Sequence, residues 1–468
     1  MGKLFINLFA FFCCVSSFAQ NVQKDSPKES VVTFGDDSIM IRRIANEILV
    51  HSKAYDNLHD LTKNVGSRLS GSAGFYKAEQ WGLKVLQKSG ADKAWLQECM
   101  IPHWVRGGKD EAVANLASQK KNLDVIALGN SIGTGPKGIS ANVIQVRSFE
   151  ELDKIKDSVK GKIVFYNYKF NPTFINVFQA YGDAVRYRGA GASRAAKYGA
   201  VAMIVRSMSE SADNNPHTGA LSYDTTLPKI PAIAIGLKDA DWLDSILNYK
   251  RINIFLKTGG HFLPDTVGHN VIGELTGAEF PDEYITIGGH LDSWDPAEGA
   301  HDDGAGIVHT IEVLRAFKAL GYKPKHSIRF VLFANEENGL RGGLKYAEVA
   351  KNKNETHIFA VESDAGGFSP RGYSFGGSAE QLKKVQSWIP LLIWYGVYQI
   401  VNGGGGADIS PLNANSNTPV AELMPDTQRY FDYHHARNDV FENVNRRELE
   451  LGAVNMAALV YLVDKYGL

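Results

Sequence analysis

Histidine and acidic side chains gather at a few places in the second half of the sequence, mostly just after apolar runs. They are His290 and Asp292, Asp302 and Asp303, Glu336 and Glu337, Asp364, and His434 and His435. Imidazole nitrogens and carboxylate oxygens are ligands that Zn²⁺ accepts, and catalytic sites leave one position open for water. These groups therefore predict a metal centre that contains no thiolate.

The inventory is large enough for two ions. Two ions roughly 3.5–4 Å apart need one bridging carboxylate, and each ion then takes one histidine and one further carboxylate. Asp292 follows His290 by two residues, so at a strand end it can accept the second N–H of that imidazole. Glu336 and Glu337 are adjacent and point in different directions, so one can bind metal while the other acts as a general base. The residues alone leave open which glutamate does which.

Each group also has an ordinary structural explanation when taken alone. A His-x-Asp sequence is usually incidental, an Asp-Asp-Gly sequence often starts a helix, and Glu-Glu and His-His pairs are usually solvated. All of them fall at strand ends or in adjacent loops of one region, and this joint placement favours a functional site.

The elements that must position these residues alternate between strand and helix. Strands are predicted at 269–275, 284–290, 327–334 and 357–364, and helices at 304–321, 339–350 and 446–466. This order predicts an α/β fold, with a mixed, largely parallel sheet sandwiched by helices. In such sheets the active site lies at the carboxyl ends of the strands.

The first half of the chain is organised differently. Helical patterns cover 38–64 and 75–90, and a strand pattern covers 93–99. Further strands are expected at 123–131, 141–146, 161–167 and 230–236, and a helix followed by a strand at 191–207. Because this unit has no acid–histidine cluster, we predict an inserted domain at 125–262 that divides the metal-binding domain into 21–124 and 263–468.

Residues 1–20 have the pattern of a signal peptide. Lys3 precedes an apolar stretch from Leu4 to about Val15, and Ser17 and Ala19 occupy the small-residue positions before a cleavage site. The stretch is shorter than the roughly 20 residues that a membrane span needs. The sequence therefore predicts a secreted or periplasmic protein. Cleavage would leave Cys99 as the one remaining cysteine, which excludes an intrachain disulfide.

Composition excludes several other classes of function. Lys and Arg total 50 against 51 for Asp and Glu, so the net charge of -1 gives no reason to bind nucleic acid. Apolar residues make up 44% of the chain, which is ordinary for a globular protein. No later apolar run is long enough to predict a membrane span.

Four segments resemble one known family. GGHLDSWDPAEGAHDDGAGI, FANEENGLRGG, ESDAGG and YHHARND are similar to motifs of the co-catalytic dizinc aminopeptidase and glutamate carboxypeptidase family. The resemblance covers essentially the whole mature chain, and the insertion resembles a protease-associated domain. It implies the zinc exopeptidase fold and two Zn²⁺ ions per chain.

The resemblance also implies a role for each matching residue. Glu336 would be the general base and acid, and Asp292 would orient His290. The pairing of Asp364 and Glu337 with the two ions stays open. The family pattern places an Asp four residues after the late histidine ligand, which favours His435 because Asp439 follows it at that spacing. His434 is the alternative and would otherwise line the substrate pocket. The implied ligands are His290, Asp302 as the bridge, Glu337, Asp364 and His435.

The implied activity is hydrolysis of dipeptides or short peptides with free termini by a secreted, homodimeric exopeptidase. A broad zinc aminopeptidase is the near alternative, and a single-zinc acyltransferase of the glutaminyl cyclase kind is another. A catalytically inactive receptor on the same fold is disfavoured, because no expected ligand is missing. Within NGGGGADISPL, Gly404 and Gly405 could expose N–H groups that hold a substrate carboxylate, although a plain loop would have the same sequence.

Overall fold

The computed structural model describes residues 35–116 and 119–468, so the predicted signal peptide lies outside the described residues. Residues 36–468 form one compact unit. Within the described ranges, no helix combines the length and the apolar character that crossing a bilayer requires.

The first of two sheets has eight strands, of which β11 pairs in parallel with both β12 and β13. Strands β1 and β10, and β10 and β12, pair antiparallel, so the sheet is mixed, as the sequence predicted. In spatial order the strands are β1 (Lys93–Val105), β10 (His261–Leu275), β12 (His326–Phe333), β11 (Phe280–His290), β13 (Thr356–Glu362), β16 (Val420–Pro425), β14 (Pro370–Gly376) and β15 (Gln399–Asn402).

The central strands are apolar and buried on both faces, which explains why they read as continuous hydrophobic runs instead of alternating patterns. Because β11, β12 and β13 run parallel, their carboxyl ends meet at one edge of the sheet. His290 ends β11, and Glu336 and Asp364 follow β12 and β13 closely. This edge is where the predicted metal ligands come together.

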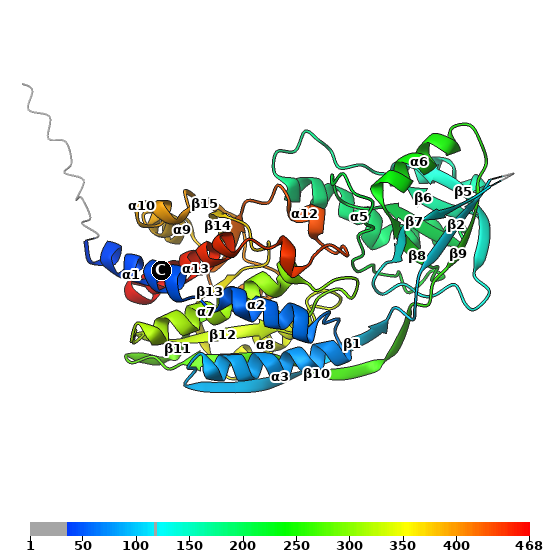
Figure 1. Ribbon diagram of the computed structural model, residues 1–468. Helices are drawn as coiled ribbons and strands as arrows, with labels where there is room; N and C mark the ends of the chain where they lie inside the picture. The colour runs from blue at the N-terminus through cyan, green and yellow to red at the C-terminus, as the bar shows by residue number, and fades with distance from the viewer. Residues whose placement is uncertain (1–34, 117–118) are drawn as a thin grey trace, which may run out of the picture. The chain divides into compact units, whose positions relative to one another are not determined.

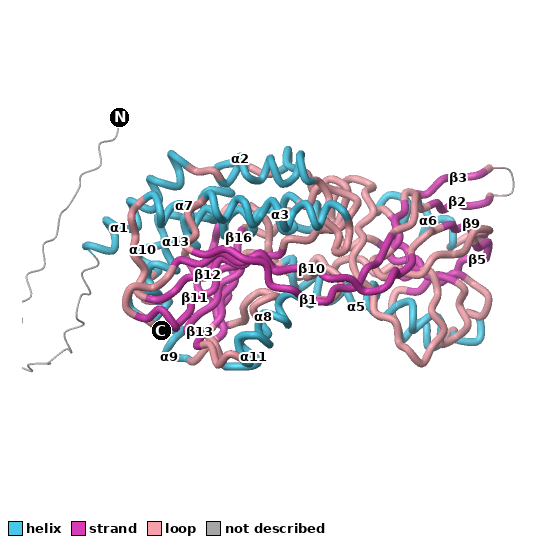
Figure 2. The backbone as a smooth tube through the Cα atoms, turned by 90° about the horizontal axis from the view of Figure 1, so that it is seen from below, coloured by secondary structure: helices cyan, strands magenta, loops and turns pink. Residues whose placement is uncertain are grey.

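Helices cover both faces of this sheet (Figure 2). On one side lie α2 (Ala54–His59), α3 (Ala73–Lys88), α7 (Ala305–Ala319) and α13 (Arg446–Tyr466), and on the other lie α8 (Arg341–Asn352) and α11 (Ser410–Ser416). Helix α7 is buried over almost its whole surface, because α13 packs against it on the side away from the sheet. Helix α13 has the bounds that the sequence predicted.

The helix predicted over 38–64 is instead three pieces: α1 (Gly35–His51), α2 and a π-helical turn at Asp60–Val65. The break falls at Ser52, whose hydroxyl accepts the backbone N–H of Ala54 and so competes with helix continuation. Among the other short helices are α9 (Ala379–Gln386), α10 (Ile389–Leu392), α12 (Tyr430–Tyr433), a π-helical turn at Ala300–Gly304, and single turns at Lys156–Ser158, Ile393–Tyr395 and Phe441–Asn443.

The second sheet also has eight strands, and β5, β6, β7 and β8 pair in parallel within it (Figure 1). Its helices are α4 (Phe149–Lys154), α5 (Val177–Ala196) and α6 (Leu237–Leu247). In spatial order the strands are β3 (Lys120–Leu123), β2 (Glu111–Asn115), β9 (Asn253–Lys257), β5 (Ile139–Val146), β6 (Ile163–Tyr166), β7 (Ala202–Arg206), β8 (Ala232–Ile235) and β4 (Val125–Ala127).

This sheet takes strands from before residue 125, where the insertion was predicted to start. Strand β2 pairs with both β3 and β9, and its Ala112 and Ala114 share a core with Ile254 and Leu256. The alternation in residues 111–115 is short and consists of small residues, so it gave little signal in the sequence. Helix α5 likewise begins at Val177, before the pattern at 191, with the Asn176 side chain capping its first turn. The division into domains stays a prediction.

Candidate metal centre

Five predicted ligands converge at the carboxyl edge of the first sheet. His290 Nε2 lies 3.1 Å from Asp302 Oδ1 and 3.2 Å from Asp364 Oδ1. His435 Nε2 lies 3.2 Å from Asp302 Oδ2 and 3.0 Å from Glu337 Oε2. The two oxygens of Asp302 therefore face two different histidines. The sequence left open which of Asp364 and Glu337 accompanies each histidine. In the structure Asp364 lies beside His290, and Glu337 lies beside His435.

The donor atoms of this cluster fit a cation. Four buried atoms have no hydrogen-bond partner among the described residues: His290 Nε2, Asp302 Oδ2, Glu337 Oε1 and Asp364 Oδ1. Buried polar atoms in folded proteins are nearly always hydrogen-bonded, so four orphans within one cluster need an explanation. Lone pairs that converge from imidazoles and carboxylates are the donor set of a zinc site.

The electrostatics of the cluster point the same way. Burial alone would lower the pKa of both histidines, but neighbouring carboxylates raise the pKa of His290 well above its usual range and that of His435 to about 10. Burial raises the pKa of Glu337 to about 7, with Asp302 adding to the effect. The carboxylates thus attract positive charge strongly, which a divalent ion would supply.

Two aspartates position Asp302 without facing the histidine Nε2 atoms. Asp303 follows Asp302 through a cis peptide bond, and its carboxylate accepts the backbone N–H groups of His290 (3.0 Å) and Gly306 (2.9 Å). Asp439 accepts the N–H groups of His301 (2.7 Å) and Asp302 (3.1 Å). Sequence reasoning gave neither residue a role at the site. The Asp-Asp-Gly sequence, which is typical of a helix start, was the available signal for Asp303.

Asp292 lies where it was predicted but does something else. His290 Nδ1 is 3.0 Å from the main-chain oxygen of Asp292 and 3.8 Å from its carboxylate, so the backbone orients the imidazole. The Asp292 carboxylate instead accepts the Ser70 hydroxyl (2.9 Å) and the N–H of Glu336 (3.0 Å). The reason is that the loop after β12 presents backbone donors that need a buried acceptor. Asp292 therefore fixes the loop that carries Glu336 and Glu337.

Glu336, the predicted general base, lies on the same loop as Glu337. The hydrogen bond from its backbone N–H to the Asp292 carboxylate holds it there. Burial raises its pKa well above the usual range of a carboxyl group, while nearby His290 acts in the opposite direction and Asp364 and Glu337 add to the rise. A carboxyl group with a raised pKa and a fixed backbone is suited to take up and return a proton near neutral pH.

Both late histidines are close to Asp302, but they differ in their second neighbour. His434 Nε2 is 3.8 Å from Asp302 Oδ2, against 3.2 Å for His435 Nε2, and only the latter also faces Glu337. The two rings stack with centroids 3.5 Å apart. Both histidines and Asp302 offer ligand atoms within 4.8 Å of one another, yet the contact with Glu337 favours His435.

The glycine loop uses one of its two predicted donors within the fold. Gly403 N–H bonds to the Phe375 carbonyl oxygen, and Gly404 N–H bonds to the Ser374 hydroxyl at 3.0 Å. Gly405 packs against the side chains of Ile409 and Val420. That Gly404 and Gly405 hold a substrate carboxylate stays a prediction.

The cluster is closed on one side and more open on another. Beside Asp302, Glu337 and His435 there is a cavity of only about 10 Å³, covered by the segment 294–299. The side chain of Asp364 is 18% exposed, against 1% for that of His290. Ala365, the next residue, lines a cavity of about 610 Å³ together with Glu422 and Phe178. Asp364 is thus the more exposed of the two ligands, and the residue that follows it borders this cavity.

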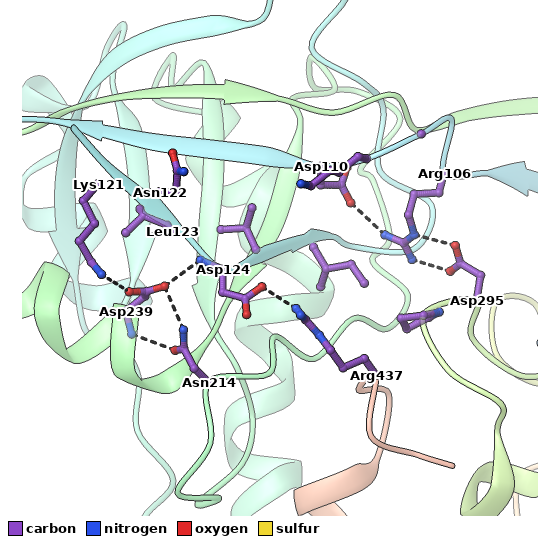
Figure 3. Close-up of a pocket in the computed structure, with 15 residues that line it drawn as sticks. Arg106, Asp110, Lys121, Asn122, Leu123, Asp124, Asn214, Asp239, Asp295 and Arg437 are labelled. Carbon is purple, nitrogen blue, oxygen red and sulfur yellow. Dashed lines mark hydrogen bonds and ion pairs between the residues drawn. The ribbon is translucent and has the colours of Figure 1, made fainter. Parts of the chain in front are cut away.

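A larger cavity of about 790 Å³ is lined by charged side chains that pair with one another (Figure 3). These pairs are Arg106 with Asp295 and Asp110, Lys121 with Asp239, and Arg437 with Asp124. None of the five converging ligands lines this cavity, although it shares Pro296 with the small cavity beside the cluster. Two of its ion pairs involve the loops that follow His290 and His435.

We expect Arg106 to be important for stability. Its guanidinium binds Asp295 through two contacts of 2.7 and 2.6 Å and also neighbours the buried Asp110. The change Arg106→Met leaves these carboxylates without their cation, so the free energy of unfolding should fall by about 3 kcal/mol. Urea denaturation measures it. The exposed Arg437→Met is the matched control and should lose less than about 1 kcal/mol. Equal losses would contradict the expectation.

Comparison with known proteins finds relatives along most of the chain. The model of peptidase family M28 matches residues 270–460. Carboxypeptidase Q of Homo sapiens is 36% identical over 437 residues, which is 93% of this chain and 90% of that protein. Carboxypeptidase Q of Xenopus laevis is 35% identical and covers 98% of this chain and 96% of its own.

Solved structures give a consistent result. The peptidase M28 precursor from Shewanella amazonensis superimposes with a TM-score of 0.87 at 33% identity, covering 92% of this chain and 97% of that one. A zinc aminopeptidase from Bacillus subtilis has a TM-score of 0.64 at 20% identity, covering 88% and 94%. The second likeness is one of fold.

Proposed function

Since this chain belongs to peptidase family M28, we propose that it is a secreted exopeptidase that uses two zinc ions to hydrolyse dipeptides and other short peptides with free termini. It is a zinc metallopeptidase of the carboxypeptidase Q type. The zinc count, the substrate length, the secretion and the assembly as a homodimer are the parts that we propose. Secretion is supported by the pattern of residues 1–20.

One observation carries the proposal of two ions. The two carboxylate oxygens of Asp302 each face a different histidine, at 3.1 and 3.2 Å, and each histidine has one further carboxylate beside it. This is the arrangement that a bridging carboxylate between two ions requires. His290, Asp302 and Asp364 would hold one ion, and Asp302, Glu337 and His435 the other.

The protein's own residues then account for the proton transfers of peptide hydrolysis. Zinc bound at such a centre lowers the pKa of water and polarises a carbonyl oxygen. Glu336 accepts a proton from the attacking water as that water adds to the carbonyl carbon of the peptide bond. Glu336 then gives this proton to the leaving amine as the C–N bond breaks, which returns the carboxylate to its first state. The Asp292 carboxylate keeps Glu336 in place by accepting the backbone N–H of Glu336.

The cavity that begins at Ala365 is the proposed place for the amino-terminal residue of the substrate. It adjoins Asp364, the more exposed ligand, and its wall includes the carboxyl group of Glu422, whose pKa burial raises to about 8. A volume of about 610 Å³ accommodates one or two residues, because drug-sized ligands occupy clefts of roughly 300–1,000 Å³.

The test combines metal content with a substrate panel. The purified protein should hold two zinc ions per chain and cleave unblocked dipeptides, while amino-terminally blocked dipeptides stay intact. Dialysis against a chelator should abolish turnover and lower the thermal unfolding temperature, since binding stabilises the folded state, and added zinc should restore both. Efficient cleavage of aminoacyl anilides and long peptides would instead indicate a broad aminopeptidase. Zinc binding without any cleavage would indicate a receptor.

A further inference from the structure

A buried arginine of the second sheet's α5 lies beside the metal centre without a negatively charged partner. Arg188 is 9% exposed, and its guanidinium forms no ion pair with Asp or Glu in the described part of the chain. Its Nε is a buried atom that has no hydrogen-bond partner among the described residues. A buried cation without an anion is costly to the fold, so its retention needs another explanation.

Helix α5 lies beside α12, in the segment that leads to the late histidines (Figure 1). Phe178 stacks on Tyr430 with centroids 5.4 Å apart, and Tyr181 packs 5.1 Å from His434. One guanidinium nitrogen of Arg188 donates to the Tyr181 hydroxyl at 2.7 Å, and another lies 3.4 Å from His435 Nδ1. The same helix thus lines the cavity at Phe178 and reaches His435 at Arg188.

The contact between Arg188 and His435 is not a hydrogen bond when His435 serves as a ligand. His435 Nε2 faces Asp302 and Glu337 and must offer its lone pair to bind metal, so its Nδ1 carries the proton. That proton faces the Thr218 carbonyl oxygen at 3.4 Å. Two N–H groups then lie side by side, and Arg188 Nε also has no acceptor among the described residues.

The backbone around this point leaves space for the arginine. A Cβ atom at Gly219 would lie 2.5 Å from the guanidinium carbon of Arg188 and 2.7 Å from His435 Nδ1. Gly219 also has a φ of +124°, which side-chain-bearing residues rarely adopt. The absence of a side chain here is what lets the guanidinium approach the imidazole.

We propose that Arg188 binds the free α-carboxylate of the peptide substrate and thereby selects dipeptides. This inference rests on the proposed peptidase function. A guanidinium is the group that pairs best with a carboxylate, through two parallel N–H bonds. The Arg188 guanidinium lies 3.4 Å from Nδ1 of a histidine proposed as a ligand, so a carboxylate bound there would belong to a residue close to the scissile bond. Each added residue would move that carboxylate by about 3.5 Å.

The test compares L-Leu-L-Ala with its C-terminal amide. For the change Arg188→Met, kcat/KM for L-Leu-L-Ala should fall about 30-fold, mainly through KM, because a charge-assisted hydrogen bond is lost. The value for the amide should stay within about twofold. Arg188→Lys should restore part of the loss, since lysine keeps the charge but not the planar fork. The exposed Arg186→Met, on the same helix, is the matched control and should leave both substrates unaffected.

A binding measurement separates this inference from the proposed function. Calorimetry should show that the zinc-loaded Glu336→Gln protein binds L-Leu-L-Ala more tightly than its amide. In the double variant Glu336→Gln/Arg188→Met the two peptides should bind with equal affinity. If the wild type cleaves neither peptide, the dipeptidase proposal fails, and this titration still decides the role of Arg188. Equal losses for acid and amide would overturn the inference, as would no binding of either. L-Leu-L-Glu amide carries a side-chain carboxylate but no free α-carboxylate. If Arg188→Met lowers kcat/KM for this peptide alone, the inference is also overturned.

Discussion

Replacing Asp302 by Asn should lower peptidase turnover by about 1,000-fold or more and reduce bound zinc below two ions per chain. The two oxygens of Asp302 face His290 and His435, so an amide, with one oxygen and one NH₂ group, cannot bridge two cations. Metal ions supply several kcal/mol of transition-state stabilisation, which corresponds to this loss in rate. Zinc content and kcat/KM are measured on one sample.

The metal-free form provides the control for this variant. Without zinc, Asp302 still pairs with His290 and His435, so any change in the unfolding temperature of the chelator-treated protein measures the metal-independent effect of the substitution. Zinc should raise that temperature much less in Asp302→Asn than in the wild type. The exposed Asp282→Asn, on β11, should behave as the wild type does. A variant that keeps two zinc ions would show that Asp302 is not the bridge.

The change Glu336→Gln should lower kcat by roughly 100- to 10,000-fold while leaving zinc content at the wild-type value, because general-base catalysis contributes that much and Gln cannot accept the proton. The side chain keeps its size, and its backbone N–H still bonds to Asp292. KM should change little, since substrate binding does not depend on that proton. Steady-state kinetics and metal analysis on the same preparation test both statements.

The neighbouring glutamate is the matched comparison. Glu337 Oε2 lies 3.0 Å from His435 Nε2, so Glu337→Gln should weaken zinc binding as well as turnover. Two variants one residue apart therefore differ in metal content. If Glu336→Gln loses zinc and Glu337→Gln keeps it, the two assigned roles are exchanged. Normal turnover in Glu336→Gln would exclude it as the base.

Much of the fold followed from local pattern. The strands and helices of the second half alternate, and their apolar runs are long, so their order and type were predictable. Helix 446–466 is an example, with an Asn cap and an uninterrupted apolar stripe. Residues 111–115 show the opposite case, since a strand of small residues gains its place only by pairing with β9.

The sequence by itself determined the chemistry of the site. Ligand type, the absence of thiolates and the Glu336–Glu337 pair follow from residue identity and spacing, because covalent order places His290, the two glutamates and Asp364 at or just after strand ends. The pairing of Asp364 with His290, the turn of the Asp292 carboxylate toward Glu336 and the approach of Arg188 to His435 were decided by tertiary structure alone. These contacts join segments that are far apart in the chain. The direction of each side chain there depends on which buried donors need an acceptor, and a local sequence pattern does not contain that information.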